Sequence, residues 1–332
     1  MCWDEILLPP VANVSKIYGV RPMSLTVVDL LTPLLFVILL FDILLKSRRY
    51  PNAYEARDTK ISLLMAFGYF VTYGIYAHTT VLIFRYIYEF SLFNFENIII
   101  AWTFCFILDD LGYYIYHRVS HRTRWFWSAH VNHHSSQYFN YSTGFRQSWL
   151  TIIAPSAIFK TPLLLFGFPP YMIIACAGIN AFYQFCLHNE NIPRLHPWIE
   201  FILNTPSNHR VHHGINDEYL DKNFSGVFIF WDRLFGTYMP ENATPRYGIT
   251  TQLASFNLME NVFHEWHGLW MDFKNARGLG KLSVLASPPS RQERGQYPFL
   301  TCMPEAPTSL PNGDTVSGKV MLFEQQTARR EI

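Results

Sequence analysis

The feature that most constrains this 332-residue chain is the grouping of eight of its 13 histidines into three short motifs. They are His117 and His121 in HRVSH, His130, His133 and His134 in HVNHH, and His209, His212 and His213 in HRVHH. On a helix, residues three and four apart lie on the same face, so each spacing points its imidazoles along one stripe. The pattern therefore predicts that three separate segments meet at a shared metal site.

The ligand type and number indicate two metal ions. Neutral imidazole nitrogen suits borderline metals such as iron, zinc and copper. The five cysteines are scattered without a CxxC pair, so a thiolate site is not indicated. Two sets of three histidines and one pair exceed the needs of one ion, because a transition metal takes about six ligands at most. We expect two ions, with iron as the preferred metal, close enough together to activate dioxygen.

Three further residues are candidates for the same site. His188 ends an apolar segment and is expected to complete the ligand shell of one ion, and Glu190 is expected to orient it. Asp110 stands seven residues before His117. It either accepts the second ring N–H of that ligand or is a solvated residue near a helix end. The four remaining histidines are predicted to be structural or on the surface: His78, His196, His264 and His267.

Long apolar segments predict an all-α integral membrane protein. Half of the residues are hydrophobic and only 15% are charged, which is few for a soluble chain of this length. About 20 apolar residues cross a bilayer as a helix. The chain has about four such spans, one of them a hairpin whose two arms flank GFPP: Ser24–Leu45, Ile61–Ile87, Ile98–Tyr116, and Trp149–Phe166 with Tyr171–Leu187. A soluble protein with buried apolar helices is the alternative.

Basic residues predict the orientation of these helices. Lys46, Arg48, Arg49, Arg57 and Lys60 all lie in the connection between the first two spans, which favours the cytosolic side for that loop. Counting spans from there places all three motifs and His188 on the cytosolic face. We expect a multi-pass protein of the endoplasmic reticulum membrane, capped by a cytosolic, histidine-rich helical di-metal domain. The net charge of +1 gives no reason to expect nucleic acid.

Composition divides the chain once, near residue 275. Residues 1–275 show no linker or repeat and are predicted to form one membrane-embedded domain that carries the di-metal site. Residues 276–332 are rich in Pro, Ser, Gly and charge, as in ASPPSRQERGQYP, and predict a polar, flexible tail.

The order of HxxxH, HxxHH, an apolar hairpin and a second HxxHH resembles the fatty acid hydroxylase and sterol desaturase superfamily of membrane di-iron oxygenases. The stretches DLGYYIYHRVSH, WSAHVNHHSSQYFNYSTGFRQS, YQFCLHNE and LNTPSNHRVHHGINDEYLDKNFSGVFIFWDRLFGT are similar, within it, to the alkylglycerol monooxygenases. The resemblance covers roughly Ile98 to Thr237.

The resemblance implies a ligand set, a reductant and a substrate. The ligands of two Fe ions would be His117, His121, His130, His133, His134, His188, His209, His212 and His213. Tetrahydrobiopterin would supply electrons, and dioxygen would hydroxylate an O-alkyl glycerol ether lipid next to its ether oxygen, releasing a fatty aldehyde and a glycerol derivative. Two alternatives stay open: a sterol or fatty-acid hydroxylase or desaturase that takes electrons from cytochrome b5, and a non-catalytic membrane protein that binds zinc.

Overall fold

The computed structural model describes residues 23–49, 53–253 and 255–289. Within these ranges the regular structure is helical, apart from one antiparallel β-bridge between Gly214 and Tyr247. The helices are α2 (Met23–Arg49), α3 (Ala56–Tyr88), α4 (Ile98–Arg122), α5 (Arg124–His134), α6 (Tyr141–Gly144), the 3-10 helix η2 (Ser156–Lys160), α7 (Thr161–Leu165), α8 (Pro170–Leu187), α9 (Pro197–Ile202), α10 (Pro206–His212), α11 (Phe230–Leu234), α12 (Leu258–Asn275) and α13 (Gly280–Ala286). The all-α prediction is confirmed.

Three of these helices are long and apolar enough to cross a membrane: α3, α4 and α8. They contain the predicted spans Ile61–Ile87, Ile98–Tyr116 and Tyr171–Leu187. The first predicted span, Ser24–Leu45, lies within α2, which packs against α8. Because the side chains of α2 are described only for residues 31–46, its crossing of the membrane stays a prediction.

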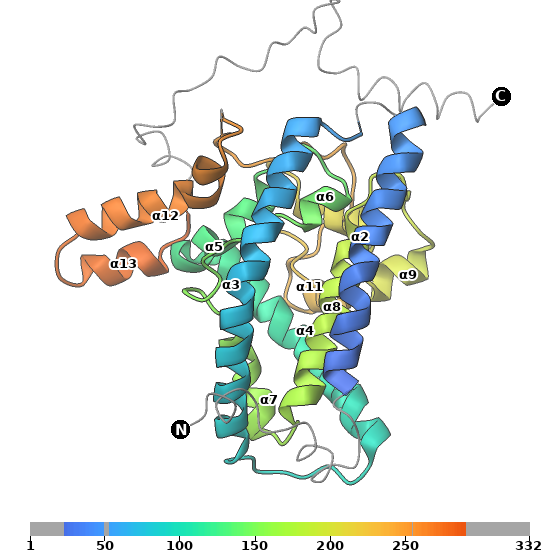
Figure 1. Ribbon diagram of the computed structural model, residues 1–332, viewed down its shortest axis with the longest axis vertical. Helices are drawn as coiled ribbons and strands as arrows, with labels where there is room; N and C mark the ends of the chain where they lie inside the picture. Colours follow the sequence, from blue (N-terminus) through green and yellow to red (C-terminus); the bar gives the residue numbers. More distant parts are fainter. Residues whose placement is uncertain (1–22, 50–52, 254, 290–332) are drawn as a thin grey trace, which may run out of the picture.

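Figure 1 shows α2, α3 and α8 along the long axis of the molecule, with α4 rising diagonally between them. Large apolar side chains on α3 point away from the bundle, and Phe67, Val71 and Ile75 are 71%, 61% and 66% exposed. In water a face of this size would be a liability. It fits a helix whose outer side contacts lipid.

The predicted hairpin is wrong in its first arm. Trp149–Phe166 is not one helix but a series of turns followed by η2 and α7. Pro155 has an extended backbone before η2, and Pro162 lies in the first turn of α7. Because proline lacks an N–H and restricts the residue before it, a continuous helix cannot pass through both positions.

The largest buried apolar cluster ties these shorter elements to the long helices. Leu163, Leu164 and Phe168 pack against Cys105 of α4 and Ile173 of α8. These contacts form an apolar core at the α7 end of the bundle.

Beyond the bundle, α12 and α13 form a second helical pair that packs against α5 and projects sideways in Figure 1. Helix α13 follows the predicted boundary at residue 275, and residues 290–332 lie outside the described part. The division into a domain of residues 1–275 and a flexible tail therefore stays a prediction.

Candidate metal centre

All the predicted ligands lie at the C-terminal ends of helices. HRVSH lies in the last turns of α4, which ends at Arg122. After the single extended residue Thr123, α5 begins at Arg124 and ends with HVNHH. His188 is the residue that follows α8, and HRVHH ends α10. Each helix C-terminus carries a partial negative charge from its unpaired carbonyls. Four such ends around one centre favour a bound cation even though the ligands themselves are neutral.

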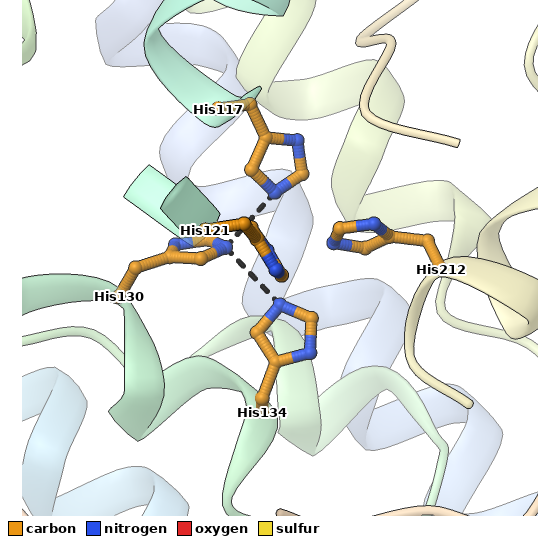
Figure 2. A group of neighbouring side chains, drawn as sticks. All are labelled: His117, His121, His130, His134 and His212. Carbon is orange, nitrogen blue, oxygen red and sulfur yellow. Dashed lines mark hydrogen bonds between the residues drawn. The ribbon is translucent and has the colours of Figure 1, made fainter. Parts of the chain in front are cut away.

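The nine histidines form two compact groups. The nitrogen atoms within each group all lie within 4.8 Å of one another. The first group has His117, His121, His130, His134 and His212, and the second has His133, His188, His209 and His213. Figure 2 shows the five rings of the first group pointing toward a common centre.

Each HxxHH motif is divided between the two groups, which differs from the expected single stripe. His130 and His134 belong to the first group, whereas His133 belongs to the second. Consecutive side chains on a helix point about 100° apart, since a turn takes 3.6 residues. The HH pair therefore serves both centres, and this places the two groups side by side.

Backbone carbonyls fix which ring nitrogen faces each centre. His117 Nδ1 donates to the Phe224 carbonyl at 2.7 Å, and His212 Nδ1 donates to the Lys222 carbonyl at 3.0 Å. His188 Nδ1 donates to the Gln184 carbonyl at 2.9 Å. Because a neutral imidazole has one N–H, the Nε2 atoms of these three rings present lone pairs to the interior.

The spacing of these lone pairs fits a metal ion. His130 Nε2 lies 2.9 Å from His117 Nε2 and 3.1 Å from His134 Nε2, and His188 Nε2 lies 3.2 Å from His209 Nε2. Two nitrogens bound at about 2.1 Å to one ion are about 3 Å apart when they are adjacent ligands.

Buried ring nitrogens without a hydrogen-bond partner also indicate a metal site. Among the described residues, Nε2 of His121, His212 and His213 has none. Such orphaned atoms cost about 1–3 kcal/mol each unless a ligand satisfies them. Both groups therefore fit a borderline divalent ion.

The protonation states of the groups suit ligation at neutral pH. Burial, reinforced by neighbouring imidazoles, lowers the pKa of His134, His209 and His213 well below 6.5. Burial also lowers the pKa of His188 to about 4. These side chains are neutral at pH 7, which is the form that binds metal.

One short segment, residues 221–225, borders the first group. Asp221 and Asn223 have positive φ angles of 58° and 55°. Asp232 accepts hydrogen bonds from Phe224 N at 2.8 Å and Ser225 N at 2.9 Å. These bonds hold the Lys222 and Phe224 carbonyls toward the histidines.

Asp221 also reaches the first group with its side chain, which lies 3.7 Å from His121 Nδ1 and 3.3 Å from Arg122. Burial alone would raise the pKa of Asp221, but the neighbouring His121 and the Arg122 charge hold that pKa below its usual value. Asp221 was not predicted, because it lies eight residues after His213 and belongs to none of the three motifs.

Asp110 does not take the position next to His117 that was expected for it. The Phe224 carbonyl occupies that position. Asp110 is buried and accepts instead from Val227 N at 2.8 Å, Phe228 N at 3.0 Å, Trp231 Nε1 at 3.1 Å and Asn180 Nδ2 at 2.7 Å. The solvated alternative is also wrong, because the carboxylate joins α4 to α8 and to the segment before α11.

Glu190 likewise does not orient His188, whose Nδ1 is taken by the Gln184 carbonyl. Its side chain hydrogen-bonds Tyr247, and its charge acts on Arg210. Tyr247 stacks on Phe139, whose ring centroid lies 5.4 Å from that of His188. Glu190 therefore supports the wall of the second group rather than a ligand.

The four other histidines lie outside both groups. His78 and His196 are exposed, and His264 Nδ1 donates to the Asn261 carbonyl within α12. His267 is exposed on the same helix.

A cavity of about 420 Å³ leads from the membrane helices to the histidines. Its walls come from α2, α3, α4 and α8, and His130, His133 and His188 lie on its surface. Eight of the nine histidines are buried, and His130 is partly exposed where it meets this cavity. Both groups can thus be reached by one molecule bound in the cavity, whose size is typical of a small-molecule site.

Residues 102–237 match the family model described as Fatty acid hydroxylase. The alkylglycerol monooxygenase of Danio rerio is 42% identical over 205 residues, which are 60% of this chain and 45% of that protein. The human alkylglycerol monooxygenase is 43% identical over 57% of this chain and 42% of its own length, and that of Xenopus tropicalis is 38% identical over the same shares.

The chain thus spans less than half the length of these curated relatives. No solved structure gives a significant match.

Proposed function

We propose, from the premise that residues 102–237 carry a fatty acid hydroxylase domain, that this chain is a membrane-bound monooxygenase acting on alkylglycerol lipids. It hydroxylates the carbon next to the ether oxygen. The resulting hemiacetal separates into a fatty aldehyde and a glycerol derivative. The alkylglycerol monooxygenases of zebrafish and human support this choice over a sterol or fatty-acid hydroxylase.

The observation that carries the proposal is the cavity that joins the apolar helices to both histidine groups. It runs beside Ile173 and Phe84 at one end and meets His130, His133 and His188 at the other. An alkyl chain can lie among the apolar side chains while the ether linkage reaches the histidines. A protein that bound two ions only for structural stability would not need a cavity that opens onto the histidines.

The proposed ligands are the nine histidines of the two groups, and the proposed metal is iron, with one ion in each group. Bound iron would supply the oxygen activation that an unreactive C–H bond requires. One atom of dioxygen enters the C–H bond, and the other leaves as water with two electrons and two protons from the reductant. Tetrahydrobiopterin is the proposed reductant.

The chain itself contributes position and environment. Carbonyls of residues 222, 224 and 184 orient three of the rings, so that the lone pairs converge before any ion arrives. The apolar walls hold the alkyl chain and exclude water from the carbon that reacts. The proposed location is the endoplasmic reticulum membrane, with the histidines on the cytosolic side.

The test is turnover by the purified, iron-loaded protein. Incubation with 1-O-hexadecylglycerol, tetrahydropterin and dioxygen is expected to yield hexadecanal in proportion to dioxygen consumed. Replacing tetrahydropterin with cytochrome b5 and its reductase separates the proposal from the sterol and fatty-acid hydroxylases. Full iron occupancy without aldehyde in the first assay would contradict it, and two zinc ions with no dioxygen consumption would favour the non-catalytic alternative.

Variants separate chemistry from folding in the same assay. His133→Ala and His212→Ala each remove one proposed ligand, from different groups, and are expected to abolish turnover. His264→Ala lies outside both groups and is expected to leave turnover nearly intact. Equal loss in all three would indicate misfolding and not a loss of ligands.

A further inference from the structure

We propose that Tyr113 and Gln184 form a binding site for a hydroxyl group of the lipid's glycerol, and that this pair selects alkylglycerols over plain alkyl ethers. The inference rests on the proposed function and adds to it the residues that recognise the head group. Both side chains lie on the wall of the cavity, beside the histidines.

Helix α8 presents a graded stripe to the cavity. His188, Gln184 and Asn180 are spaced four residues apart, so their side chains follow one face of the helix. Ala177 and Ile173 continue the same face. The stripe is therefore polar near the histidines and apolar farther into the bundle, which matches a lipid whose glycerol lies by the metal centre and whose chain extends away from it.

The carboxylate of Asp110 sets the direction of the amides on this stripe. It only accepts hydrogen bonds, so the Asn180 amide must turn its NH₂ toward Asp110, at 2.7 Å. Asn180 Oδ1 then accepts from Gln184 Nε2, at 2.5 Å. Both amide orientations follow from the one carboxylate. The Oε1 atom of Gln184 is left on the side away from Asn180, as an acceptor.

Tyr113 completes the pair from the opposite helix, α4. Its side chain and that of Gln184 line the same cavity, and its ring centroid lies 5.2 Å from that of His117. A phenol oxygen can accept a hydrogen bond while its own O–H donates. Tyr113 and Gln184 together therefore offer at least one acceptor to a hydroxyl that enters the cavity.

The surroundings make this acceptor selective. A hydroxyl placed in an apolar cavity is destabilised if it finds no hydrogen-bond partner. A polar site shaped for a hydroxyl is in turn left unpaired by an analogue that lacks one. The lining of the same cavity also includes the apolar side chains of Ile174, Ala177 and Phe185. An ether without the glycerol hydroxyls would leave the pair without its partner.

The experiment compares two lipids with the same alkyl chain, 1-O-hexadecylglycerol and hexadecyl propyl ether. The preference is the ratio of their kcat/KM values, measured on protein reconstituted in phosphatidylcholine nanodiscs. Tyr113→Phe removes one oxygen atom, and Gln184→Met removes the amide at nearly equal length. Each is expected to lower the preference about tenfold, chiefly by raising KM for the alkylglycerol, with iron content unchanged. Ile179→Ala, on the lipid-facing side of α8, is the matched control.

A second measurement keeps this inference separate from the proposed function. Equilibrium binding of the two radiolabelled lipids to the same nanodiscs requires no turnover. If the wild-type protein converts neither lipid, the proposed function fails, but tighter binding of the alkylglycerol that is lost in Tyr113→Phe still supports the hydroxyl site. If both variants keep the wild-type preference in binding and in turnover, the inference is overturned.

Discussion

Removal of His188 tests the division of the nine histidines into a group of five and a group of four. His188→Ala leaves three imidazoles in the second group, whereas His134→Ala still leaves four in the first. A structural zinc site is worth about 10–16 kcal/mol over four ligands, so one ligand contributes about 2.5–4 kcal/mol. This corresponds to an affinity loss of about 10²–10³ for a single ion, since about 1.4 kcal/mol is tenfold.

The assay is a metal count after dialysis against increasing concentrations of a chelator. The wild-type protein is expected to keep two ions until the chelator competes with the group that binds its ion less tightly. In His188→Ala one ion is expected to leave at a chelator concentration about 10²–10³ lower, while the other is released as in the wild type. His134→Ala provides the matched comparison, because it removes a ligand of the same type from the other group.

Two results would refute the assignment. The first is loss of both ions together in His188→Ala, which would mean that the groups do not bind independently. The second is an unchanged release curve, which would mean that His188 is not a ligand even though its Nε2 lies 3.2 Å from those of His133 and His209.

Three further predictions concern stability and pH. Asp110→Leu strands at least three buried donors and is expected to lower the free energy of unfolding by at least about 3 kcal/mol, seen as a lower Tm in detergent; an unchanged Tm would contradict the role of this carboxylate. Gly68→Ala would place a methyl group into the ring of Trp149 and is expected to cost about 1–3 kcal/mol, whereas Gly74→Ala meets open space and is expected to stabilise its helix by up to about 1 kcal/mol; equal effects would refute the packing argument. On acidification the ions are expected to stay bound until well below pH 6.5, because burial lowers the pKa of the ligands, to about 4 for His188, and protons compete only below that range; metal release at pH 6 would be inconsistent with this.

Much of the candidate site could be predicted because helical spacing is a local property. In all three motifs the histidines four residues apart share a group. The apolar segments between the motifs fix which helix ends can meet. His188 was also predicted, from its place at the end of an apolar span, and it joins the second group. The division of HVNHH between two centres depends on how α5 is rotated about its axis, which tertiary packing sets.

The polar residues around the site were harder to predict. Asp110 was singled out because a carboxylate in an apolar segment needs a partner. Its donors, however, lie far along the chain: Asn180 is 70 positions later, and the other three come from residues more than 100 positions later. Asn180 and Gln184 did carry a usable signal, since they lie eight and four residues before His188 in a segment that is otherwise apolar. The helix predicted for the first arm of the hairpin was wrong because the prediction used hydrophobicity alone, whereas Pro155 and Pro162 interrupt a helix.

The segment of residues 221–225 has a mechanical consequence. The Phe224 carbonyl orients the His117 ring on α4, and the Lys222 carbonyl orients the His212 ring on α10. A shift of this backbone would therefore tilt both rings together. Ion binding and the ordering of residues 221–225 are therefore coupled. Asp232 accepts hydrogen bonds from the N–H groups of Phe224 and Ser225, and deuterium uptake at these two amides should become faster when a chelator removes the ions. The exchange rate of this loop would then measure ion occupancy without any substrate.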